Sequence, residues 1–598
     1  MTHLDLDTMP RRTLPRRTPT LLLLATATCP VAAFSASSST PIKVERWGLF
    51  QLNLTAPTAA MADNPFDTPV SATFTLGSTA VTVDGFYDGG DDFRIRFSPS
   101  QEGSWSFKTA SPIASLDGVS GTLVVTPAAP GQHGPVVSRG FGLYYADGTP
   151  HFSTGTTCYQ WTSKDFATQE QTLATLASST SFNKIRMTVF PKWYVYNHAN
   201  PVEAGTAYEV IPGSVAANAS AWGCVGSDCP STSGSFDLTR FNVSYWRRYE
   251  SLLARLRAMN VVADIIVFHP YDGGHWGFDC MGGRDADTYD TTNDKRYLRY
   301  LAARLSAYSN VWWAMANEWS FNQCKGRGVV DQGDGQATSP VWDELFEALS
   351  AADPHGRQMS IHNGNLLYNH SRPWITHVSL QGHENDTAML RTRYGKPVVW
   401  DEEKYEGTIP EGWGHLTGPQ EADRFWWGLS LGAHAGHSET ILRAGTPEDA
   451  QPLWWAKGGE LVGTSPPRIA WLSRWAAKEQ LDLGRLQPQL LPPGCSPTGP
   501  GGGAAHGDAA ARADPPLCWG SMLSKPGAWA FVHFLMAGKW EVPLLQGGPG
   551  WGDAWSVSEV DYWNMTERPI GHGVPTKAGV LVEVKALPYN AVFRVSTQ

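Results

Sequence analysis

Val311-Trp-Trp-Ala-Met-Ala-Asn-Glu-Trp319 is the stretch of sequence that decides the fold, a short apolar run that ends in an amide and a carboxylate. Its length, its aromatic and small apolar residues and the helical patterns on both sides are typical of a buried strand in a parallel sheet. Because alternate residues of a strand share a face, Ala314, Ala316 and Glu318 are expected to point one way. Asn317 would then point the opposite way. We interpret the stretch as a strand that delivers Glu318 into a cleft, with a solvated or ion-paired glutamate as the alternative.

Predicted strands and helices alternate over residues 134–483. Eight short apolar runs alternate there with amphipathic helical patterns, an order typical of a (β/α)8 barrel. The predicted strands are His151–Thr157, Lys184–Thr188, Val261–Phe268, Val311–Asn317, Met359–His362, His377–Leu380, Pro397–Asp401 and Leu431–Ala435. Chemistry on this fold takes place at the carboxyl ends of the strands. The polar residues that end each run are therefore the candidates for a functional site.

Two further β-rich regions flank the predicted barrel. Residues 41–130 and 516–598 contain short alternating runs broken by Gly, Pro, Asp and Asn, which predict an antiparallel β-sandwich in each place. Residues 484–515 are rich in Pro, Gly and Ala and are interpreted as a linker. The expected fold class is a multidomain α/β protein, with a TIM barrel flanked by an N-terminal and a C-terminal β-sandwich domain.

The first 36 residues have the pattern of a secretory signal peptide, with arginines followed by a run rich in Leu and Ala. That run is too short and too interrupted to span a bilayer, and no later stretch reaches the roughly 18 to 20 apolar residues of a membrane helix. A leader that targets an organelle or the endomembrane lumen is the alternative. Six Asn-x-Ser/Thr sequons also fit secretion. They are Asn53, Asn218, Asn242, Asn369, Asn385 and Asn564. We therefore expect a secreted glycoprotein.

The chain has 8 cysteines, of which Cys29 lies in the predicted leader. The spacing of the others accommodates three disulfides and one spare thiol, Cys158. The candidate pairs are Cys224 with Cys229, Cys280 with Cys324, and Cys495 with Cys518. Connectivity cannot be deduced from spacing alone. No cluster of Cys and His has the spacing of a zinc site, so neither a metal nor another cofactor is expected.

Charge and composition narrow the classes of partner. A formal net charge of -10 and a pI near 5.9 argue against a nucleic-acid partner, which would need a basic surface. The 26 tryptophans suit a carbohydrate partner, because aromatic rings are stacking platforms for sugars. Filling a large core nevertheless accounts for most of them. The mature chain is expected to bind carbohydrate and no membrane.

Two predicted strand ends carry a glutamate. Glu318 follows strand four and Glu402 follows strand seven, and these strands face one another across the mouth of a barrel. Hydrolysis of a glycosidic bond needs one carboxylic acid to protonate the leaving oxygen and one carboxylate to attack the sugar, and a separation of about 5 Å predicts retention of configuration. We assign Glu318 as acid/base and, because alternation places it on the face of Trp400, Glu402 as nucleophile. Glu403 is the fallback, and Asp401 is a supporting partner.

Five motifs together carry a family resemblance. They are Phe268-His-Pro-Tyr-Asp, His275-Trp-Gly-Phe-Asp, Asn310-Val-Trp-Trp-Ala-Met-Ala-Asn-Glu, Lys396-Pro-Val-Val-x-Asp-Glu and Gly432-Ala-His-Ala-Gly-His-x-Glu. The sequence resembles the retaining glycoside hydrolases of clan A and, more closely, secreted glycosidases with apiosidase-like or collagenase-like barrels. The resemblance covers nearly the whole mature chain and implies a catalytic barrel between two small β domains.

The resemblance also implies roles for single residues. Asn317 would bind the 2-hydroxyl of the sugar, and Arg186 would hold the nucleophile ionised. The residues expected to line the sugar subsite are His269, Tyr271, His383 and Tyr405, and the candidate stacking surfaces are Trp161, Trp193, Trp276 and Trp319. The chain departs from the family pattern by a long insertion over residues 196–237, which would overhang the cleft.

Two other hypotheses stay open at this point. The chain could be a catalytically inactive, carbohydrate-binding extracellular glycoprotein that keeps the barrel. It could also be a metal-dependent hydrolase that uses His269, Asp272 and His275 and loses activity on chelation. These three residues lack the i, i+4 helical spacing of a typical metal site, which argues against the metal-dependent reading.

Overall fold

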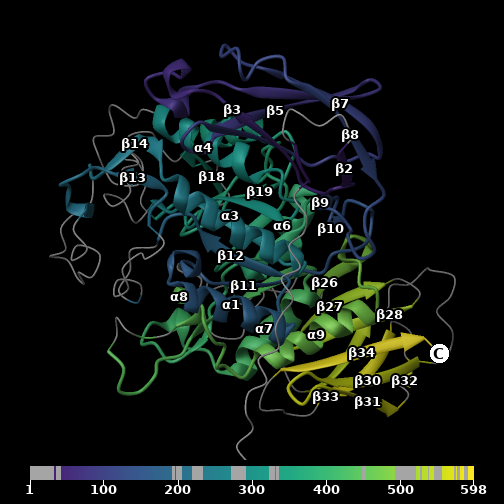
Figure 1. The fold of residues 1–598 in the computed structure, drawn as a ribbon. Coiled ribbons are helices and arrows are strands. Elements are labelled where there is room, and N and C mark those ends of the chain that lie inside the picture. Colours follow the sequence, from purple (N-terminus) through teal and green to yellow (C-terminus); the bar gives the residue numbers. More distant parts are fainter. Residues whose placement is uncertain are drawn as a thin grey trace, which may run out of the picture.

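The structure is a computed structural model of the chain. It describes residues 32–34, 42–191, 196, 205–217, 234–270, 291–321, 330–331, 336–447, 451, 453–491, 520–525, 528–535, 538–543, 555–571, 574–575, 579–584 and 590–597. Figure 1 shows N-terminal strands in purple, a central group of strands and helices, and C-terminal strands in yellow.

The central unit is a cylinder of parallel strands. Its strands are β11 (Thr154–Thr157), β12 (Lys184–Thr188), β15 (Val262–Phe268), β16 (Val311–Ala316), β19 (Gln358–Ser360), β21 (Val378–Leu380), β22 (Val398–Trp400) and β24 (Ala433–His437). They pair in parallel in the order β19-β16-β15-β12-β11-β24-β22-β21. A parallel bridge between His362 and Ser379 joins the two ends of this sheet. Chain order therefore runs around the cylinder, as in a (β/α)8 barrel. The eight strands predicted from the sequence are present, with ends shifted by a few residues.

Helices alternate with these strands and cover the outside of the barrel (Figure 1). They are α1 (Phe166–Ser179), α3 (Val243–Ala258), α4 (Thr292–Leu305), α5 (Pro340–Ala352), α6 (Thr387–Tyr394), α7 (Gly418–Ser430), the single turn α8 (Trp454–Lys457) and α9 (Pro466–Lys478). Helices α3, α4, α5 and α9 each bury a largely apolar stripe. Helix α4, for example, buries Tyr297, Leu298 and Leu301. Among the described residues, no helix has both the length and the apolar character that crossing a membrane requires.

The barrel interior combines apolar packing with buried charge. Trp312 and Val399 pack together inside the cylinder. The ammonium of Lys184 lies 5.7 Å from the centroid of the Trp312 ring. The same ammonium contacts Asp264 at 3.0 Å and also pairs with Asp401. Because a buried charge without a partner is costly, this cluster fixes the strands that carry its members.

The N-terminal region forms a β-sheet with its own apolar core. Its strands are β1 (Ala32–Phe34), β2 (Ile42–Glu45), β3 (Phe50–Thr55), β4 (Ser71–Leu76), β5 (Thr79–Tyr87), β6 (Asp92–Phe97), β7 (Gly103–Ala110) and β8 (Ser120–Thr126), in the order β1-β3-β6-β5-β4-β7-β8-β2. Phe74 stacks on Phe97 in the core, with ring centroids 4.1 Å apart. Strand β1 lies within the segment predicted to be a signal peptide and pairs in parallel with β3.

The C-terminal region contains two sheets. The larger has the order β26 (Gln487–Leu491), β27 (Gly520–Lys525), β28 (Trp529–Phe534), β34 (Ala591–Thr597), β30 (Trp555–Asp561) and β31 (Thr566–Gly571), and the smaller has the order β29 (Gly538–Pro543), β33 (Gly579–Val584) and β32 (Val574–Pro575). Residues 487–491 were predicted to be linker, which is wrong, because β26 pairs antiparallel with β27. Pro488 obscured this strand in the sequence, but proline is tolerated on an edge strand.

The remaining strands form small sheets in the connections. They are β9 (Val136–Arg139) with β10 (Gly142–Tyr145), β13 (Tyr208–Val210) with β14 (Phe236–Phe241), β17 (Val330–Asp331) with β18 (Gln336–Thr338) and β20 (Leu367–Tyr368), and β23 (Glu406–Gly407) with β25 (Glu439–Thr440). Within the predicted insertion over residues 196–237, the described part contributes β13 and the first residues of β14.

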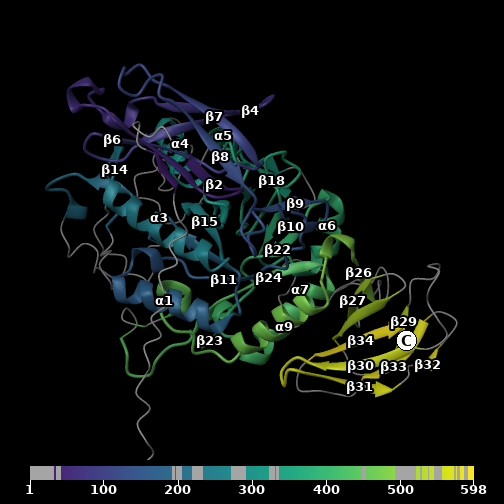
Figure 2. The same cartoon turned by 45° about the vertical axis from the view of Figure 1, so that its right-hand side comes forward.

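The C-terminal sheet packs on helices α7 and α9, as Figure 2 shows. Trp475 of α9 packs edge to face on Phe531, with ring centroids 4.4 Å apart. Asp423 of α7 accepts hydrogen bonds from Tyr562, at 2.9 Å, and from Asn590, at 2.8 Å. The sheet is thus attached by both apolar and polar contacts.

A buried ionic network attaches the N-terminal sheet to the barrel helices. Glu250 of α3 contacts Arg304 of α4 at 2.5 Å and Arg96 of β6 at 2.9 Å. Arg304 also pairs with Asp88 at 2.8 Å. These side chains are almost fully buried. Burial opposes ionisation of Glu250, but Arg304 and Arg96 outweigh it and lower its pKa to about 2.

Glu250→Gln should therefore destabilise the protein at pH 7 by about 3 to 5 kcal/mol, because it removes the charge that balances two buried guanidinium groups. A lowered pKa contributes stability that is full above the pKa of about 4.3 in the unfolded chain and is lost as pH falls towards 2. Urea unfolding between these pH values should show a steeper loss of free energy of unfolding for wild type than for the variant.

The matched control is Glu170→Gln, which breaks an exposed ion pair with Arg255 and should cost less than about 1 kcal/mol. Equal pH slopes for wild type and Glu250→Gln would contradict the assignment of the shift to Glu250.

Candidate active site

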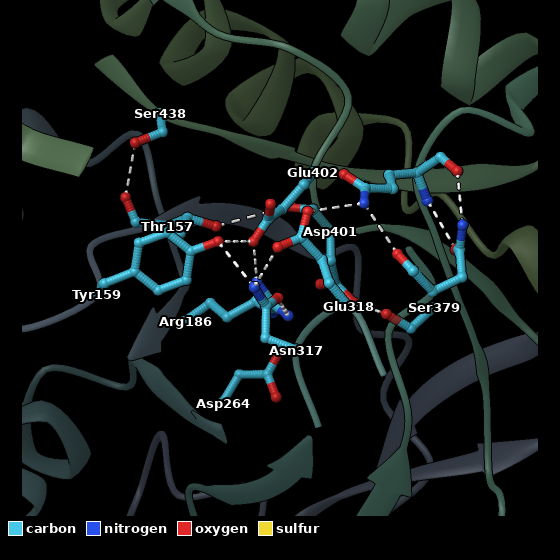
Figure 3. Close-up of polar contacts among 12 residues, drawn as sticks. Thr157, Tyr159, Arg186, Asp264, Asn317, Glu318, Ser379, Asp401, Glu402 and Ser438 are labelled. Atoms are coloured by element: carbon cyan, nitrogen blue, oxygen red, sulfur yellow. Dashed lines mark hydrogen bonds and ion pairs between the residues drawn. The ribbon is translucent and has the colours of Figure 1, made fainter. Parts of the chain in front are cut away.

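Polar side chains from several strand ends meet at the mouth of the barrel, and Figure 3 shows most of them. They are Tyr159 after β11, Arg186 in β12, Asn317 and Glu318 after β16, Gln381 after β21 and Glu402 after β22. All except Arg186, which lies within β12, follow the carboxyl end of a parallel strand, where the barrel fold places its functional side chains.

Glu402 is held by a cation and a phenol. Arg186 Nη1 and the hydroxyl of Tyr159 both donate hydrogen bonds to Oε1 of Glu402. Arg186 is 1% exposed. Burial disfavours its charge, but the carboxylate of Glu402 outweighs this and raises the pKa of Arg186 well above its usual range. A guanidinium in this position favours the ionised form of the carboxylate that it contacts.

Glu318 lies among amide groups. Asn317 Nδ2 donates to Oε2 of Glu318 at 3.2 Å, and Gln381 Nε2 donates to Oε1 at 3.0 Å. Asn317 Nδ2 also lies 3.2 Å from the hydroxyl of Tyr159, and its Oδ1 accepts from Arg186 Nη2. The amide of Asn317 therefore links the surroundings of the two glutamates.

Strand alternation wrongly predicts which side chains share a face at both of these strand ends. Asn317 and Glu318 point into the same mouth, although alternation separates them. The reason is that β16 ends at Ala316 and Glu318 has a left-handed backbone, with φ of 50°. A non-glycine residue held in that region is strained, and such strain is often found at functional sites.

The end of β22 shows the same break. Trp400 packs outward against Trp427 of α7, with ring centroids 5.0 Å apart, whereas Asp401 and Glu402 both point into the barrel. Glu402 therefore reaches the predicted site but does not share the face of Trp400. Alternation holds only while the chain is a paired strand, and β22 ends at Trp400.

The structure separates the three consecutive carboxylates. Burial opposes ionisation of Asp401, but Lys184 outweighs it and lowers the pKa of Asp401. Ser379 also donates a hydrogen bond to Asp401. Glu403 points away from the mouth towards Arg424, at 3.7 Å, and burial raises its pKa well above the usual range. Glu403 is thus not placed to act as nucleophile.

Comparison with known proteins gives a family match that covers the barrel. A model of the apiosidase-like catalytic domain matches residues 139–448, more than half of the chain. The chain belongs to the apiosidase-like family. A model of a domain of unknown function, DUF5060, matches residues 43–112, within the N-terminal sheet. A comparison with curated proteins found no match.

Two solved structures from Bacteroides vulgatus resemble the apiosidase-like chain. A candidate glycoside hydrolase is 29% identical with a TM-score of 0.74, and the alignment covers 93% of this chain and 99% of that one. A glycoside hydrolase of family 5 is 15% identical with a TM-score of 0.53, over 78% and 94% of the two chains. The second likeness shows the shared fold. The family match and the first structure identify the chain as a glycoside hydrolase.

Two predicted stacking residues are buried instead. Trp161 is 0% and Trp319 is 1% exposed, and Trp319 packs edge to face on Tyr368 with ring centroids 5.1 Å apart. Neither ring has a free face for a sugar, so this prediction is wrong for both. Among the described residues, nine tryptophans are less than 2% exposed, and core filling is therefore a main use of this residue here.

The other predicted subsite residues lie at different depths. Tyr405 is buried and clusters with Tyr159; burial and the charge of Glu402 raise its pKa, which places it beside the nucleophile candidate. His269 is fully buried, with Nε2 3.0 Å from the carbonyl oxygen of Phe190. The half-buried side chain of His383 pairs with Asp386 at 3.2 Å. Tyr271, Trp193, Trp276, Asp272 and His275 lie outside the described residues.

The predicted cysteine pairs also lie outside the described residues, and Cys158, expected to be the spare thiol, is buried and free.

Sequence reasoning gave no role to three residues that complete the site. Tyr159 binds Glu402, and Gln381 binds Glu318. Asn363 holds Gln381, because its Oδ1 accepts from the backbone N–H of Gln381 at 3.0 Å. Gln381 and Asn363 are among the polar strand-end residues that the sequence predicts as candidates. Tyr159 was missed, although its position two residues beyond β11 carries the same signal. Polarity alone does not rank Gln381 above His383.

Tyr159→Phe should lower kcat/KM by about 10 to 100-fold, because it removes one hydrogen bond to a charged carboxylate. Initial rates on the aryl glycoside that wild type hydrolyses fastest would measure the effect. Tyr144→Phe is the matched control, since its hydroxyl binds a carboxylate of Asp482 at 2.6 Å, away from the site. Equal losses in both variants would contradict a specific role for Tyr159.

Proposed function

We propose that the chain hydrolyses glycosidic bonds of an oligo- or polysaccharide with retention of configuration. The observation that carries the proposal is the contrast between two glutamates at one mouth. Glu402 contacts a guanidinium and a phenol, which suit an ionised nucleophile. Glu318 contacts the side-chain amides of Asn317 and Gln381. Two carboxyl groups in different environments are the arrangement that divides the roles of acid and nucleophile.

In the first step of the proposed reaction, Glu402 attacks the anomeric carbon while Glu318 gives a proton to the glycosidic oxygen. The bond from that carbon to oxygen breaks, and an ester forms between the sugar and Glu402. In the second step Glu318 takes a proton from water, which attacks the same carbon and releases Glu402. Two displacements at one carbon retain its configuration.

The neighbouring groups support these steps. Arg186 would balance the charge that Glu402 carries before attack and after release. Asn317 Nδ2 lies between Tyr159 and Glu318, a suitable position for a hydrogen bond to the sugar 2-hydroxyl, which strengthens in the transition state. No step requires a cofactor.

Glu402→Gln and Glu318→Gln should each lower kcat by about 10⁴-fold or more, because each removes a group that takes part in both displacements. Glu403→Gln is the matched control one residue away and should keep kcat within about 10-fold of wild type, since Glu403 points towards Arg424. Release of aryl alcohol from aryl glycosides, and of sugars from plant and algal polysaccharides, would measure these rates.

Loss of activity in Glu403→Gln with activity kept in Glu402→Gln would reverse the assignment. If wild type turned over no substrate, and both site variants bound a glycan as wild type does, an inactive carbohydrate-binding protein would be the better account.

We also propose that the protein is secreted and glycosylated. The leader pattern supports export, and the sequons Asn53 and Asn564 are exposed in the structure. After expression in eukaryotic cells, the protein should appear in the medium and lose mass on treatment with peptide N-glycosidase F. Asn53→Gln combined with Asn564→Gln should reduce that loss. Retention inside the cells without glycans would contradict the proposal.

A further inference from the structure

A second cluster of polar residues lies beside the barrel mouth. Glu406 in β23 and Glu439 in β25 face one another as a register pair of two short parallel strands. His437 is the last residue of β24. Glu406 follows the nucleophile candidate Glu402 by four residues, and the proposed catalytic steps use none of the three side chains.

The three side chains are buried and close together. Glu406, His437 and Glu439 are 5%, 0% and 1% exposed. One potential ligand atom from each lies within 4.8 Å of those of the other two. Among the described residues, no Lys or Arg forms an ion pair with either glutamate. Glu421 of α7 is a further fully buried carboxylate that lacks a hydrogen-bond partner in the described part.

His437 presents one ring nitrogen to this cluster. Its Nδ1 lies 3.2 Å from Oγ1 of Thr156, which also accepts a hydrogen bond from Trp454 Nε1 at 2.8 Å. The ring stacks on Phe182, with centroids 4.7 Å apart. Its Nε2 has no hydrogen-bond partner in the described part of the chain and lies 3.8 Å from Oε1 of Glu439. A proton on Nδ1 leaves the Nε2 lone pair directed at the carboxylates.

Backbone donors fix the two carboxylates. Glu406 Oε1 accepts from the N–H of Thr464 at 2.7 Å, and Oε2 accepts from the N–H of Ser465 at 2.8 Å. Glu439 Oε2 accepts from the N–H of Val462 at 2.8 Å, and its Oε1 has no such partner among the described residues. Metal-binding carboxylates and imidazoles are usually held by outer hydrogen bonds of this kind.

The geometry points to a metal site: we propose that Glu406, His437 and Glu439 bind one divalent transition-metal ion of the zinc class. Bonds of about 2.0 to 2.2 Å from zinc to nitrogen and oxygen place its ligand atoms about 3 to 4 Å apart, which these side chains reach with small movements. An imidazole ligand favours zinc and its neighbours over calcium and magnesium, which prefer oxygen. The ion would also offset the charge of two buried carboxylates.

The ion would hold together three parts of the chain. It would bind β23, the end of β24 and β25 directly. The loop of residues 462–465 that leads into α9 would be attached through its hydrogen bonds to Glu406 and Glu439. Its role would be structural, since Glu406 and Glu439 lie outside the contacts of Glu318 and Glu402. The sequence shows no metal motif because Glu406 is 31 residues from His437.

The test is metal analysis of the whole purified protein. Wild type is stripped with EDTA, refilled with zinc sulfate, desalted and measured by inductively coupled plasma mass spectrometry. It should hold about one zinc per chain, and Glu439→Gln and His437→Gln should hold less than about a tenth of that. Glu403→Gln is the matched control, because it replaces a buried neighbouring carboxyl group outside the proposed ligands, and it should keep the zinc.

Thermal unfolding provides a second measurement should His437→Gln fail to fold. Zinc should raise the Tm of stripped wild type by about 5 °C and leave the Tm of Glu439→Gln unchanged. Stripped wild type that takes up no zinc would overturn the proposal, and so would zinc content unaffected by Glu439→Gln. Higher stability of Glu439→Gln than of metal-free wild type, with no zinc bound by wild type, would instead indicate two glutamates that share a proton.

Discussion

The contact of Arg186 with Glu402 and Asn317 is the interaction on which the rest of the site depends. The guanidinium lies inside the barrel and is 1% exposed. One of its nitrogens binds the carboxylate that follows β22, and the other binds the amide that follows β16. A buried guanidinium without partners would cost several kcal/mol. The same contacts that neutralise Arg186 therefore fix the distance between strands four and seven, and so bring the two glutamates together.

The three consecutive carboxyl groups that follow β22 have different surroundings, and these surroundings give them different roles. Asp401 pairs with Lys184 inside the barrel, Glu402 pairs with Arg186 at the mouth, and Glu403 turns outward to a longer contact with Arg424. The three residues have nearly the same chemistry in isolation. Burial and the nearest cation decide which of them is structural, which is available to a substrate, and which is kept from the mouth.

Much of this arrangement could be predicted from the sequence, and the exceptions have physical causes. Apolar runs between amphipathic helices identified all eight barrel strands, because burial on both faces leaves a clear pattern. The polar residues Glu318 and Glu402 at strand ends identified the mouth. The directions of the side chains just beyond the strands could not be predicted, because the backbone is no longer extended there. The positive φ of Glu318 shows this change.

Residues that act through tertiary contacts were equally hard to find from the sequence. The sequence does not show whether a tryptophan such as Trp161 fills the core or lines a cleft. Its burial in the structure distinguishes the two roles. Tyr159 and Gln381 reach their glutamates from other strands, and no local spacing records such a contact. Strand β26 was missed for a related reason. Its proline, Pro488, is tolerated because β26 lies at the edge of the sheet, and the sequence does not show that position.

Peptide mapping of a trapped intermediate tests the central claim most directly. The protein would be incubated with an activated 2-deoxy-2-fluoro glycoside of the sugar that it hydrolyses, digested, and analysed by tandem mass spectrometry. A retaining mechanism through the residue that Arg186 holds predicts a fluoroglycosyl ester on Glu402. An ester on Glu403, or turnover to the inverted anomer with no ester formed, would contradict this account.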